Sequence, residues 1–372
     1  MALKKKLFYI VSHVQKSLAF EWTAIGLKDQ YDLTFILLNP SSSSLELLLK
    51  ANNINTILIR YEGKKNLPKA FLHLWWLFLR TRPDIVHTHL FDATLIGLTA
   101  AWLSRIKKRI YTRHNSTYHH LYFPDSVKYD LWSNYLATHI ISISQATDET
   151  LIRMEGVNPE KVVKIPHGFD LESFVDIPKD RIQKLNEKWK IKNSHPVVGV
   201  IARHIEWKGI QFVIPAFKNF LKRNQEAVLV LANSSGPYHD EISALLKDIP
   251  SDHVILIPFE EDVAALYHTF DMYVHVPIDP TCEAFGQTYV EALAAGIPSV
   301  FTKSGIAVEF IEDGKNAITV PFRETDSIDA ALQNLWEQPL LRSRLAEKGK
   351  KDVFLYFKVE PMISALSALY DQ

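Results

Sequence analysis

Two glutamates eight residues apart are the first residues in the sequence whose types and spacing could do chemistry. Glu283 follows an apolar run, residues 272–276, and a Pro-containing loop, and Glu291 lies in a helical pattern that ends at Gly296. This order predicts a strand, a loop and a helix, with Glu291 about two turns into the helix. A glutamate pair at this spacing is also typical of a solvated helix face, which is the alternative interpretation.

The predicted beginning of this helix suits a phosphorylated ligand. The backbone amides of Phe285, Gly286 and Gln287 would point outward at the positive end of the helix dipole. Amides in this position bind phosphate, and the carboxylates of Glu283 and Glu291 on either side could hold hydroxyl groups. A sugar nucleotide carries phosphate at one end and hydroxyls at the other, so the stretch indicates such a ligand.

Basic side chains occupy a second turn of the same kind. A strand pattern, residues 197–201, leads to Arg203 and Lys208, and a helical pattern begins after Gly209. Arginine offers a planar fork to a diphosphate, and lysine offers a compact charge. Loop Arg and Lys side chains are more often solvated, but their place in the first strand-to-helix turn of a second domain favours a diphosphate site.

Apolar runs and helical patterns alternate along both halves of the chain, which is typical of α/β proteins with parallel sheets. The patterns predict an N-terminal domain over residues 1–170, a charged linker over 171–194 and a C-terminal domain over 195–355. A helix at about 356–372 is a candidate to pack back on the N-terminal domain. Ligands of such sheets bind outside the carboxyl ends of the strands, so we expect the site in a cleft between the domains.

The combination of segment 198–209, Glu283-Ala-Phe-Gly286 and Glu291-Ala292 resembles the retaining glycosyltransferases of family 4. Residues 83–89, 141–145 and 163–174 are also similar, so the resemblance covers nearly the whole chain. The fold of this family is GT-B, in which two doubly wound, Rossmann-like α/β domains face each other across a cleft. The resemblance implies this fold, with the acceptor on the N-terminal domain and the nucleotide sugar on the C-terminal domain.

The resemblance also implies roles for the candidate residues. Arg203 and Lys208 would grip the donor diphosphate and stabilise the charge that grows on the departing phosphate. Glu283 would hydrogen-bond the donor sugar, and the amides of the residues that follow it would contact sugar and phosphate. Glu291 would bind the ribose hydroxyls. These roles agree with the chemistry that the residue types suggest.

Other candidate positions follow from the same resemblance. The nucleobase is expected beside Asn233 and Pro258, at the ends of neighbouring strands. In the N-terminal half, His114 stands where family members place a histidine facing the donor sugar, although a histidine at a strand end is often structural. Family members often have a Gly-rich turn after the first strand. Here Lys16 and Ser17 occupy that turn, and we expect them to contact phosphate or the acceptor.

The sequence predicts neither a metal nor a cofactor, with the nucleotide sugar acting as substrate. It contains no Asp-x-Asp pair of the kind that holds a divalent ion in glycosyltransferases of the other common fold. A zinc site formed by His87, His89, His119 and His120 is the alternative, but no cysteine lies near them. The single cysteine, Cys282, predicts a reducing compartment and a small, partly buried thiol rather than a nucleophile.

The charge is balanced overall but not along the chain. The formal net charge is zero, which gives no indication of nucleic-acid binding, whereas residues 1–110 hold 16 Lys/Arg against 7 Asp/Glu. This basic half suggests an anionic surface or acceptor nearby, with a solvated basic face as the alternative. The sequence contains no uncharged apolar run long enough for a membrane span, so we expect a cytoplasmic protein. Peripheral contact with the inner face of the membrane is the alternative.

One predicted helix has two interpretations. Residues 67–79 include Trp75 and Trp76, and residues 64–69 hold three lysines. A basic amphipathic helix can lie on an anionic bilayer. The favoured interpretation is a helix buried against the first sheet, with the tryptophan pair in the core.

The sequence predicts transfer of a hexose-type sugar, with retained configuration, from a UDP- or GDP-sugar to a hydroxyl of a sugar or lipid-linked acceptor. Polysaccharide or glycolipid synthesis at the cell surface is the expected process. No pair of nucleophilic carboxylates is evident, so a front-face substitution is preferred, with the departing phosphate as base. The alternatives are a nucleotide-sugar epimerase or hydrolase of the same fold and a non-catalytic sugar-nucleotide-binding protein.

Overall fold

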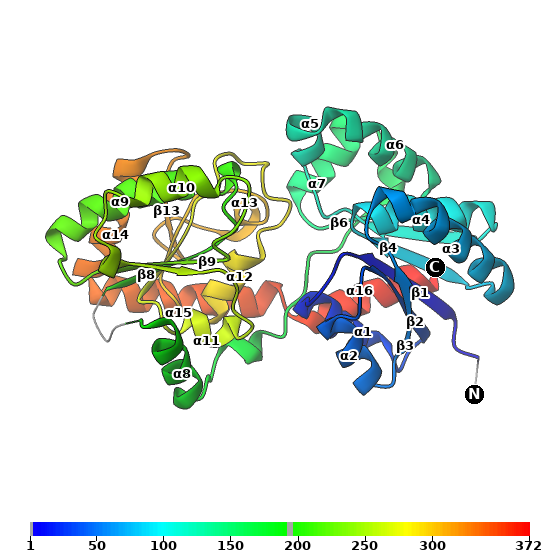
Figure 1. Ribbon diagram of the computed structural model, residues 1–372, viewed down its shortest axis with the longest axis horizontal. Helices are drawn as coiled ribbons and strands as arrows, with labels where there is room; N and C mark the ends of the chain where they lie inside the picture. Colours follow the sequence, from blue (N-terminus) through cyan, green and yellow to red (C-terminus); the bar gives the residue numbers. More distant parts are fainter. Residues whose placement is uncertain (1–2, 192–195) are drawn as a thin grey trace. The chain divides into compact units, whose positions relative to one another are not determined.

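The computed structural model describes residues 3–191 and 196–372, which divide into two compact units (Figure 1). Unit 1 comprises the described residues up to Phe169 together with Val359–Gln372, and unit 2 comprises the described residues of Asp170–Lys358. The predicted start of a C-terminal domain at residue 195 and the predicted end of the linker at residue 194 lie outside the described residues.

Unit 1 contains a sheet of seven parallel strands in the order β3-β2-β1-β4-β5-β6-β7. The strands are β1 (Lys6–Ser12), β2 (Asp32–Asn39), β3 (Asn55–Arg60), β4 (Ile85–His89), β5 (Lys108–Thr112), β6 (His139–Ser142) and β7 (Val162–Lys164). The register places Leu7 opposite Leu33 on one side and Ile85 on the other. Short, continuous apolar runs form these strands because both faces of a parallel sheet are buried.

Helices cover both faces of this sheet. They are α1 (Leu18–Leu27), α2 (Ser44–Ala51), α3 (Leu67–Thr81), α4 (Phe91–Leu103), α5 (Tyr118–Tyr122), α6 (Val127–Leu136), α7 (Gln145–Glu149) and α16 (Val359–Asp371). Successive side chains of β1 point to opposite faces. Leu7 and Tyr9 therefore pack into a core with α1, α2 and α16, whereas Phe8 and Ile10 pack into a core with α3 and α4.

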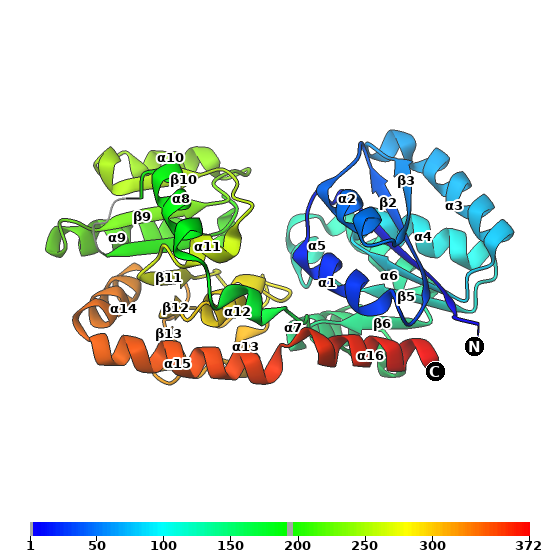
Figure 2. The ribbon, with the colours of Figure 1, turned by 90° about the horizontal axis from the view of Figure 1, so that it is seen from below.

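The last helix of the chain, α16, belongs to unit 1. Figure 2 shows it beside α1, and the side chains of Met362, Ile363 and Leu366 join the core formed with β1 and β2. The Tyr370 hydroxyl lies 2.6 Å from Nδ1 of the buried His87, which ties the helix to β4. The C-terminus therefore completes the helical layer on one face of the N-terminal sheet.

Unit 2 contains six parallel strands in the order β10-β9-β8-β11-β12-β13. These are β8 (Val197–Ile201), β9 (Val228–Ala232), β10 (Val254–Ile257), β11 (Met272–His275), β12 (Ser299–Phe301) and β13 (Ile318–Thr319). In both units the first strand in chain order lies between the second and the fourth, as in the Rossmann fold. Each unit thus confirms the predicted doubly wound α/β architecture.

The helices of unit 2 are α8 (Lys179–Trp189), α9 (Ile210–Arg223), α10 (His239–Leu246), α11 (Val263–Tyr267), α12 (Gln287–Ala294), α13 (Ala307–Phe310), α14 (Thr325–Glu337) and α15 (Pro339–Tyr356). Figure 1 shows α9 and α10 above the sheet and α8 and α11 below it. Phe217 and Phe220 of α9 and Leu332 of α14 are fully buried in one core with β8 and β9. The charged stretch after Asp170 forms a short 3₁₀-helix, Leu171–Phe174, and then α8.

The sheet order of unit 2 determines which candidate residues lie together. Strands β8, β9, β10 and β11 are neighbours and run in the same direction. Their carboxyl ends therefore form one edge, and the residues that follow them share it. Arg203 follows β8, Asn233 follows β9, Pro258 follows β10 and Glu283 lies in the loop after β11.

The structure corrects the expected burial of the tryptophan pair on α3. Ala70, Leu74, Leu77 and Phe78 form the buried stripe of this helix, whereas Trp75 is 36% exposed and Trp76 is 55% exposed. The prediction that both indoles lie in the core is therefore wrong, because they fall outside the stripe that faces the sheet. None of the helices in the described part of the chain has both the length and the apolar character that crossing a membrane requires.

Candidate active site

A buried ion pair lies at the centre of the carboxyl edge of unit 2. The Lys208 Nζ donates to Oε1 of Glu283 at 2.5 Å, and Nε2 of His275 lies 3.0 Å from the same oxygen. The side chains of Lys208 and Glu283 are 17% and 7% exposed, and that of His275 is 1% exposed. Two candidates from separate turns thus meet, and a histidine at the end of β11 joins them.

The electrostatics of this group keep Glu283 ionised. Burial by itself would raise the pKa of Glu283, but the Lys208 ammonium and the His275 hydrogen bond lower it to about 2. Burial lowers the pKa of His275, although its bond to Glu283 opposes that change. A neutral His275 donates its Nε2 proton to the carboxylate and leaves Nδ1, which is buried and without a hydrogen-bond partner, as an unused acceptor.

The turn after β8 is shaped to hold Lys208 in this position. Lys208 ends a short 3₁₀-helix, Glu206–Lys208, and its ammonium lies 4.2 Å from the centre of the Trp207 ring. Gly209 follows with φ 76°, and a Cβ atom there would lie 1.8 Å from the Val276 carbonyl oxygen. Only glycine fits this left-handed position so close to the strand end, which fixes the approach of the turn to the loop after β11.

Arg203 has a different environment from Lys208. Its side chain is exposed, and in the described residues no hydrogen bond or ion pair engages its guanidinium. Its neighbour His204 is fully buried, with Nδ1 3.0 Å from Nδ1 of His239. Arg203 therefore presents an uncommitted planar cation at the same sheet edge as the buried ion pair.

Helix α12 begins where the sequence predicted an anion-binding helix terminus. Gly286 is its N-cap residue with φ 84°, and the helix starts at the exposed Gln287. The Phe285 side chain is 3% exposed and packs against Phe357 with ring centres 5.9 Å apart. Phe285 can thus offer only its backbone to a ligand, whereas the first amides of α12 remain available at the positive end of the dipole.

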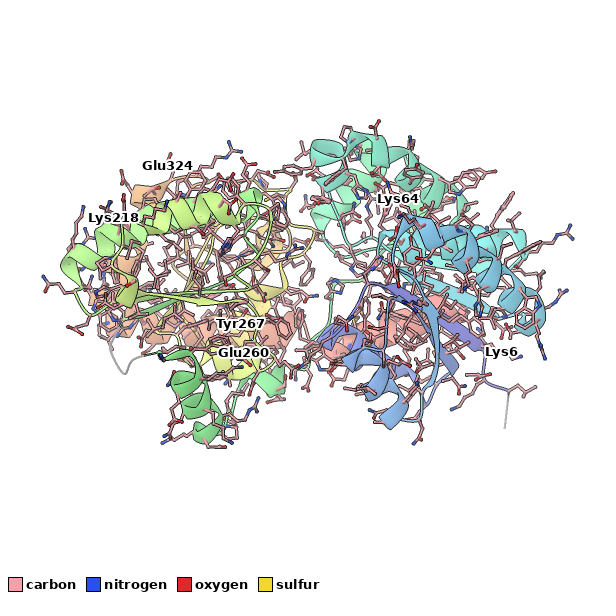
Figure 3. All side chains as sticks on the ribbon, in the orientation of Figure 1. Lys6, Lys64, Lys218, Glu260, Tyr267 and Glu324 are labelled. Atoms are coloured by element: carbon pink, nitrogen blue, oxygen red, sulfur yellow. The ribbon has the colours of Figure 1, made fainter. Side chains whose placement is uncertain are left out.

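Glu291 lies closer to the helix N-terminus than expected. Because α12 starts at Gln287, Glu291 is its fifth residue, a little over one turn in, and the expected depth of two turns is wrong. Its Oε2 accepts a hydrogen bond at 2.9 Å from the hydroxyl of Tyr267, the last residue of α11. Tyr267 is labelled in Figure 3. Burial raises the pKa of Glu291 to about 7, and the Tyr267 bond only partly opposes this rise.

The expected nucleobase positions lie at the ends of paired strands. Ala232 pairs with Ile257, so Asn233 and Pro258 are the next residues on adjacent strands. Asn233 has φ 60° and a partly buried side chain, and Pro258 is exposed. Nearby Glu260, labelled in Figure 3, is already engaged. Its Oε2 lies 2.7 Å from both Lys188 Nζ and Trp189 Nε1 of α8.

In unit 1, His114 follows β5 and lies in a group of histidines. Its Nε2 lies 2.9 Å from Nδ1 of the buried His89, and its ring stacks on His167 with centres 5.5 Å apart. Burial, together with the imidazoles of His167 and His87, holds the pKa of His114 well below its usual range. A neutral imidazole donates one hydrogen bond and accepts one but supplies no charge.

The turn after β1 contains the two remaining candidates. Lys16 is exposed, and its charge partly opposes the rise in the pKa of Glu21 that burial produces. Ser17 is the N-cap residue of α1 but makes no side-chain cap bond. His13 adopts a left-handed conformation in this turn, with φ 55°. Family members often have glycine in the same turn.

The structure shows the surroundings of the histidines considered for a zinc site and of Cys282. The described residues contain no group of three or more His, Cys, Asp or Glu side chains that could hold a metal ion. His87 is engaged by Tyr370 and by the Thr112 hydroxyl at 2.9 Å, and His119 pairs with Asp130. Cys282 is buried, and burial raises the pKa of its thiol to about 12, so the thiol stays protonated.

Sequence reasoning missed His275 and the charged group around Arg113. His275 interrupts an apolar strand, and a polar residue in a buried run was the available signal. Arg113, 2% exposed, pairs with Asp130 at 3.0 Å and with Glu155. These partners come from α6 and from beyond α7, so only the fold brings them together.

Both halves of the chain match known glycosyltransferase families. Residues 24–173 match the family model "Glycosyltransferase Family 4", and residues 181–352 match "Glycosyl transferases group 1". The capsular polysaccharide biosynthesis glycosyltransferase CapM of Staphylococcus aureus is 25% identical over 316 residues, which are 82% of this chain and 80% of CapM. The alpha-monoglucosyldiacylglycerol synthase of Acholeplasma laidlawii is 24% identical over 74% of this chain and 72% of the synthase.

The fold has close solved counterparts. The crystal structure of Anabaena HepE in complex with UDP and glucose superposes with a TM-score of 0.83 at 20% identity, over 99% of this chain and 100% of HepE. Both α/β units are thus those of a GT-B protein. Together with the two matched regions, which take in most of the sequence, this shows that the chain belongs to the glycosyltransferases of family 4.

Proposed function

We propose that the protein transfers a hexose-type sugar from a UDP- or GDP-sugar to an acceptor hydroxyl, with retention of the anomeric configuration. The observation that carries this proposal is the arrangement at the carboxyl edge of unit 2. An uncommitted Arg203, a Lys208–Glu283 ion pair and the first amides of α12 lie around one strand edge. This set matches a ligand with a diphosphate between a sugar and a nucleoside.

Each group has a task in the proposed reaction. Negative charge grows on the diphosphate as the glycosidic bond breaks, so Arg203, Lys208 and the α12 amides stabilise the transition state more than the ground state. Glu283 accepts hydrogen bonds from donor-sugar hydroxyls, and Glu291 accepts them from the ribose. The departing phosphate oxygen takes the proton of the acceptor hydroxyl, in a front-face substitution. We propose that no metal is required, because cations of the chain itself neutralise the leaving group.

The named relatives support a role in surface carbohydrate synthesis. CapM is named for capsular polysaccharide biosynthesis, and the Acholeplasma enzyme for synthesis of a glucosylated diacylglycerol. HepE was crystallised with UDP and glucose. We therefore place the present protein in polysaccharide or glycolipid synthesis, with a sugar or a lipid-linked sugar as acceptor.

Contact with the inner face of a membrane is part of the proposal. Unit 1 exposes apolar side chains along three helices, which we call the aromatic face: Leu72, Trp75, Trp76 and Leu79 on α3, Trp102 and Leu103 on α4, and Leu131, Trp132 and Tyr135 on α6. Helix α4 packs between α3 and α6 on one side of the sheet. Lys64 and Lys65, just before α3, and Lys69, in its first turn, are exposed. Tryptophan with nearby lysine is typical of surfaces that bind anionic lipid.

The test combines donor binding with product analysis. Thermal shifts with UDP-, GDP- and ADP-sugars identify the base, and the effective donor is then incubated alone and with candidate acceptors, in buffer with and without a chelator. Transfer is expected only with an acceptor, with unchanged rate in the chelator and with the product in the donor's anomeric configuration by NMR. Rapid turnover of donor alone would point to an epimerase or hydrolase, and tight binding without any turnover would point to a binding protein.

A further inference from the structure

Unit 1 contains a polar cavity, and of the candidate donor and acceptor residues above only His114 lies in its wall. The cavity has a volume of about 210 Å³ and lies at the carboxyl ends of β4 and β5, beside α4, α5 and α6. Its wall includes Phe91, His114, Tyr118, His119 and Asp130. The volume is below the roughly 300–1,000 Å³ of pockets for drug-sized ligands, which suits a single sugar ring better than a nucleotide. Ligands of doubly wound sheets bind at this edge.

A histidine held by a buried carboxylate lies in the cavity wall. Asp130 is 5% exposed, and its Oδ2 lies 2.6 Å from Nδ1 of His119. A carboxylate so placed keeps a proton on Nδ1 and leaves Nε2 as the ring nitrogen available to a ligand. The Phe91 ring meets the His119 ring edge-on, with centres 5.0 Å apart, and fixes the orientation of the imidazole.

The one guanidinium in the cavity wall is already neutralised. Arg113 is 2% exposed, its Nε donates to the Asn115 carbonyl oxygen at 2.8 Å, and its terminal nitrogens pair with Asp130 and Glu155. One guanidinium therefore faces two carboxylates, both almost fully buried. An anionic ligand group would meet no uncommitted cation among the residues that line the cavity, and it would lie close to Asp130.

We propose that this cavity binds the acceptor, and that the acceptor end it takes is an uncharged sugar ring. His119 forms a hydrogen bond with one ring hydroxyl through Nε2, and Asp130 is a positioning residue that holds His119. The rings of Phe91 and Tyr118 cover the apolar face of the sugar, as aromatic side chains do in small-ligand pockets. This inference rests on the proposed function, and it assigns the acceptor to His119 rather than to Lys16 and Ser17.

A phosphorylated acceptor end is the competing chemical class. Such a group would require a free cation or a set of free amides in the wall. His114, the other imidazole in the wall, is held neutral because burial lowers its pKa, and its Nε2 is occupied by His89. The cavity therefore favours a hydroxyl-rich, uncharged ligand over a sugar phosphate.

The experiment measures binding of simple glycosides to the full chain by ligand-observed NMR. The probes are the methyl glycosides of glucose, galactose, mannose and N-acetylglucosamine, each beside its 6-phosphate. At least one neutral glycoside is expected to bind, and more tightly than its 6-phosphate. His119→Ala is expected to weaken that binding about tenfold, through the loss of one hydrogen bond and of ring contact.

The matched control is His120→Ala. His120 is the next residue and also pairs with a buried carboxylate, Glu155 at 3.1 Å, but it lies outside the cavity wall. Its replacement is expected to change glycoside binding less than twofold. Absence of binding by every neutral glycoside, equal binding by wild type and His119→Ala, or tighter binding of the 6-phosphates would each overturn the proposal. The comparison with the 6-phosphates uses the wild type alone and stands even if a variant is unstable.

Donor binding, measured on the same samples, separates this inference from the proposed function. Nucleotide-sugar affinity is expected to be unchanged in His119→Ala, because the proposed donor residues belong to unit 2 and His119 belongs to unit 1. A wild type that binds glycosides but no nucleotide sugar would contradict the proposed function and leave the cavity assignment standing. If the wild type binds nucleotide sugar but the glycoside experiment gives one of the three contradicting results above, only the cavity assignment is overturned.

Discussion

Lys208 and Glu283 touch, with Nζ 2.5 Å from Oε1, although the sequence assigned them to different parts of the donor. The pair means that the position of each charge depends on the other. A carboxylate that already shares one oxygen with Lys208 and His275 can offer its second oxygen to a sugar hydroxyl in a fixed direction. A loss of activity on replacing either residue alone therefore reports on both.

Lys208→Met should destabilise the protein at neutral pH by about 3 kcal/mol, because it leaves a buried carboxylate without its cation. The lowered pKa of Glu283 contributes stability that is present above its ordinary pKa of 4.5 and is lost as the pH falls towards about 2. Without Lys208 this contribution shrinks, so the loss should be larger at pH 7 than at pH 4. Urea unfolding at the two pH values measures it.

A double variant checks that the effect comes from the pair. Lys208→Met/Glu283→Gln should be less destabilised than the sum of the two single variants, by about 1–3 kcal/mol. Lys218→Met, which breaks an exposed pair with Asp248, is the control and should cost less than about 1 kcal/mol. Strict additivity in the double variant would show that the ion pair is not formed in solution.

Arg203→Gln should separate catalysis from stability. Its guanidinium is exposed and uncommitted, so the free energy of unfolding should change by no more than about 0.5 kcal/mol, as for an ordinary surface substitution. The kcat should fall about a hundredfold, because one donor to the developing charge is lost. Arg203→Lys should recover only part of it, since an ammonium cannot form two parallel bonds to a diphosphate. Steady-state kinetics and thermal melts measure the two effects.

Arg344→Gln is the matched control for this prediction. Arg344 lies on α15 and is also exposed, with a single 3.4 Å contact to the Gly314 carbonyl oxygen. Its replacement should leave kcat unchanged. If Arg203→Gln retained full activity, the diphosphate could not lie against the turn after β8.

Glu291 should make donor affinity depend on pH. Its pKa is about 7, so it is mostly protonated at pH 6 and mostly ionised at pH 8. A carboxylate must be ionised to accept hydrogen bonds from both ribose hydroxyls while Tyr267 occupies one of its oxygens. Affinity for a nucleotide sugar should therefore rise about tenfold between pH 6 and pH 8, the change in the ionised fraction around that pKa. Calorimetric titration at several pH values measures it.

Glu291→Gln should abolish this dependence, and Glu347→Gln, at an exposed position on α15, should preserve it. A nucleotide sugar is the right probe because its doubly esterified diphosphate does not titrate in this range. Affinity that falls as the pH rises would contradict the assignment of Glu291 to the ribose.

The same glutamate should lower stability at high pH. Because burial raises its pKa from 4.5 to about 7, the folded state binds the proton more tightly than the unfolded state. The resulting penalty is absent below pH 4.5, grows through pH 7 and is complete above it. Glu291→Gln should thus melt at a higher temperature than wild type at pH 8 and at a similar temperature at pH 4.5. A variant that is less stable at pH 8 would contradict the raised pKa.

Most strands could be predicted because local sequence determines them. Runs such as residues 7–11 and 197–201 are continuous, apolar and bounded by turns. The first run lies within β1, and the second is β8. The helix termini were less predictable. Gly286 adopts a left-handed conformation that delays the start of α12 to Gln287, and sequence periodicity does not reveal such a delay.

The site was predictable in part, for a related reason. Arg203, Lys208 and Glu283 were found because each stands at the end of a recognisable strand. The ion pair between Lys208 and Glu283, and the contact of His275 with it, could not be predicted. They depend on how two turns more than sixty residues apart in the sequence approach each other. The exposure of Trp76 was within reach. The stripe that includes Leu74 and Phe78 already excludes it from the buried face of α3.

The aromatic face should bind anionic membranes through α3. Trp75→Ser/Trp76→Ser removes two exposed indoles without touching the buried stripe, so the fold should be retained. Co-sedimentation with vesicles that contain phosphatidylglycerol should fall about tenfold, whereas activity on a soluble acceptor should be unchanged. Wild-type binding should also weaken with added salt, because Lys64, Lys65 and Lys69 are exposed beside the indoles.

Leu355→Ser/Tyr356→Ser provides the control for that loss. These neighbours at the end of α15 are 68% and 58% exposed, so the double change removes comparable apolar surface from unit 2. Vesicle binding should stay at the wild-type level, because no lysine-flanked tryptophan pair is lost. If both double variants bound vesicles as the wild type does, or if wild type ignored anionic lipid altogether, the aromatic face would need another partner. If both lost binding equally, the attraction would be a general effect of exposed apolar surface.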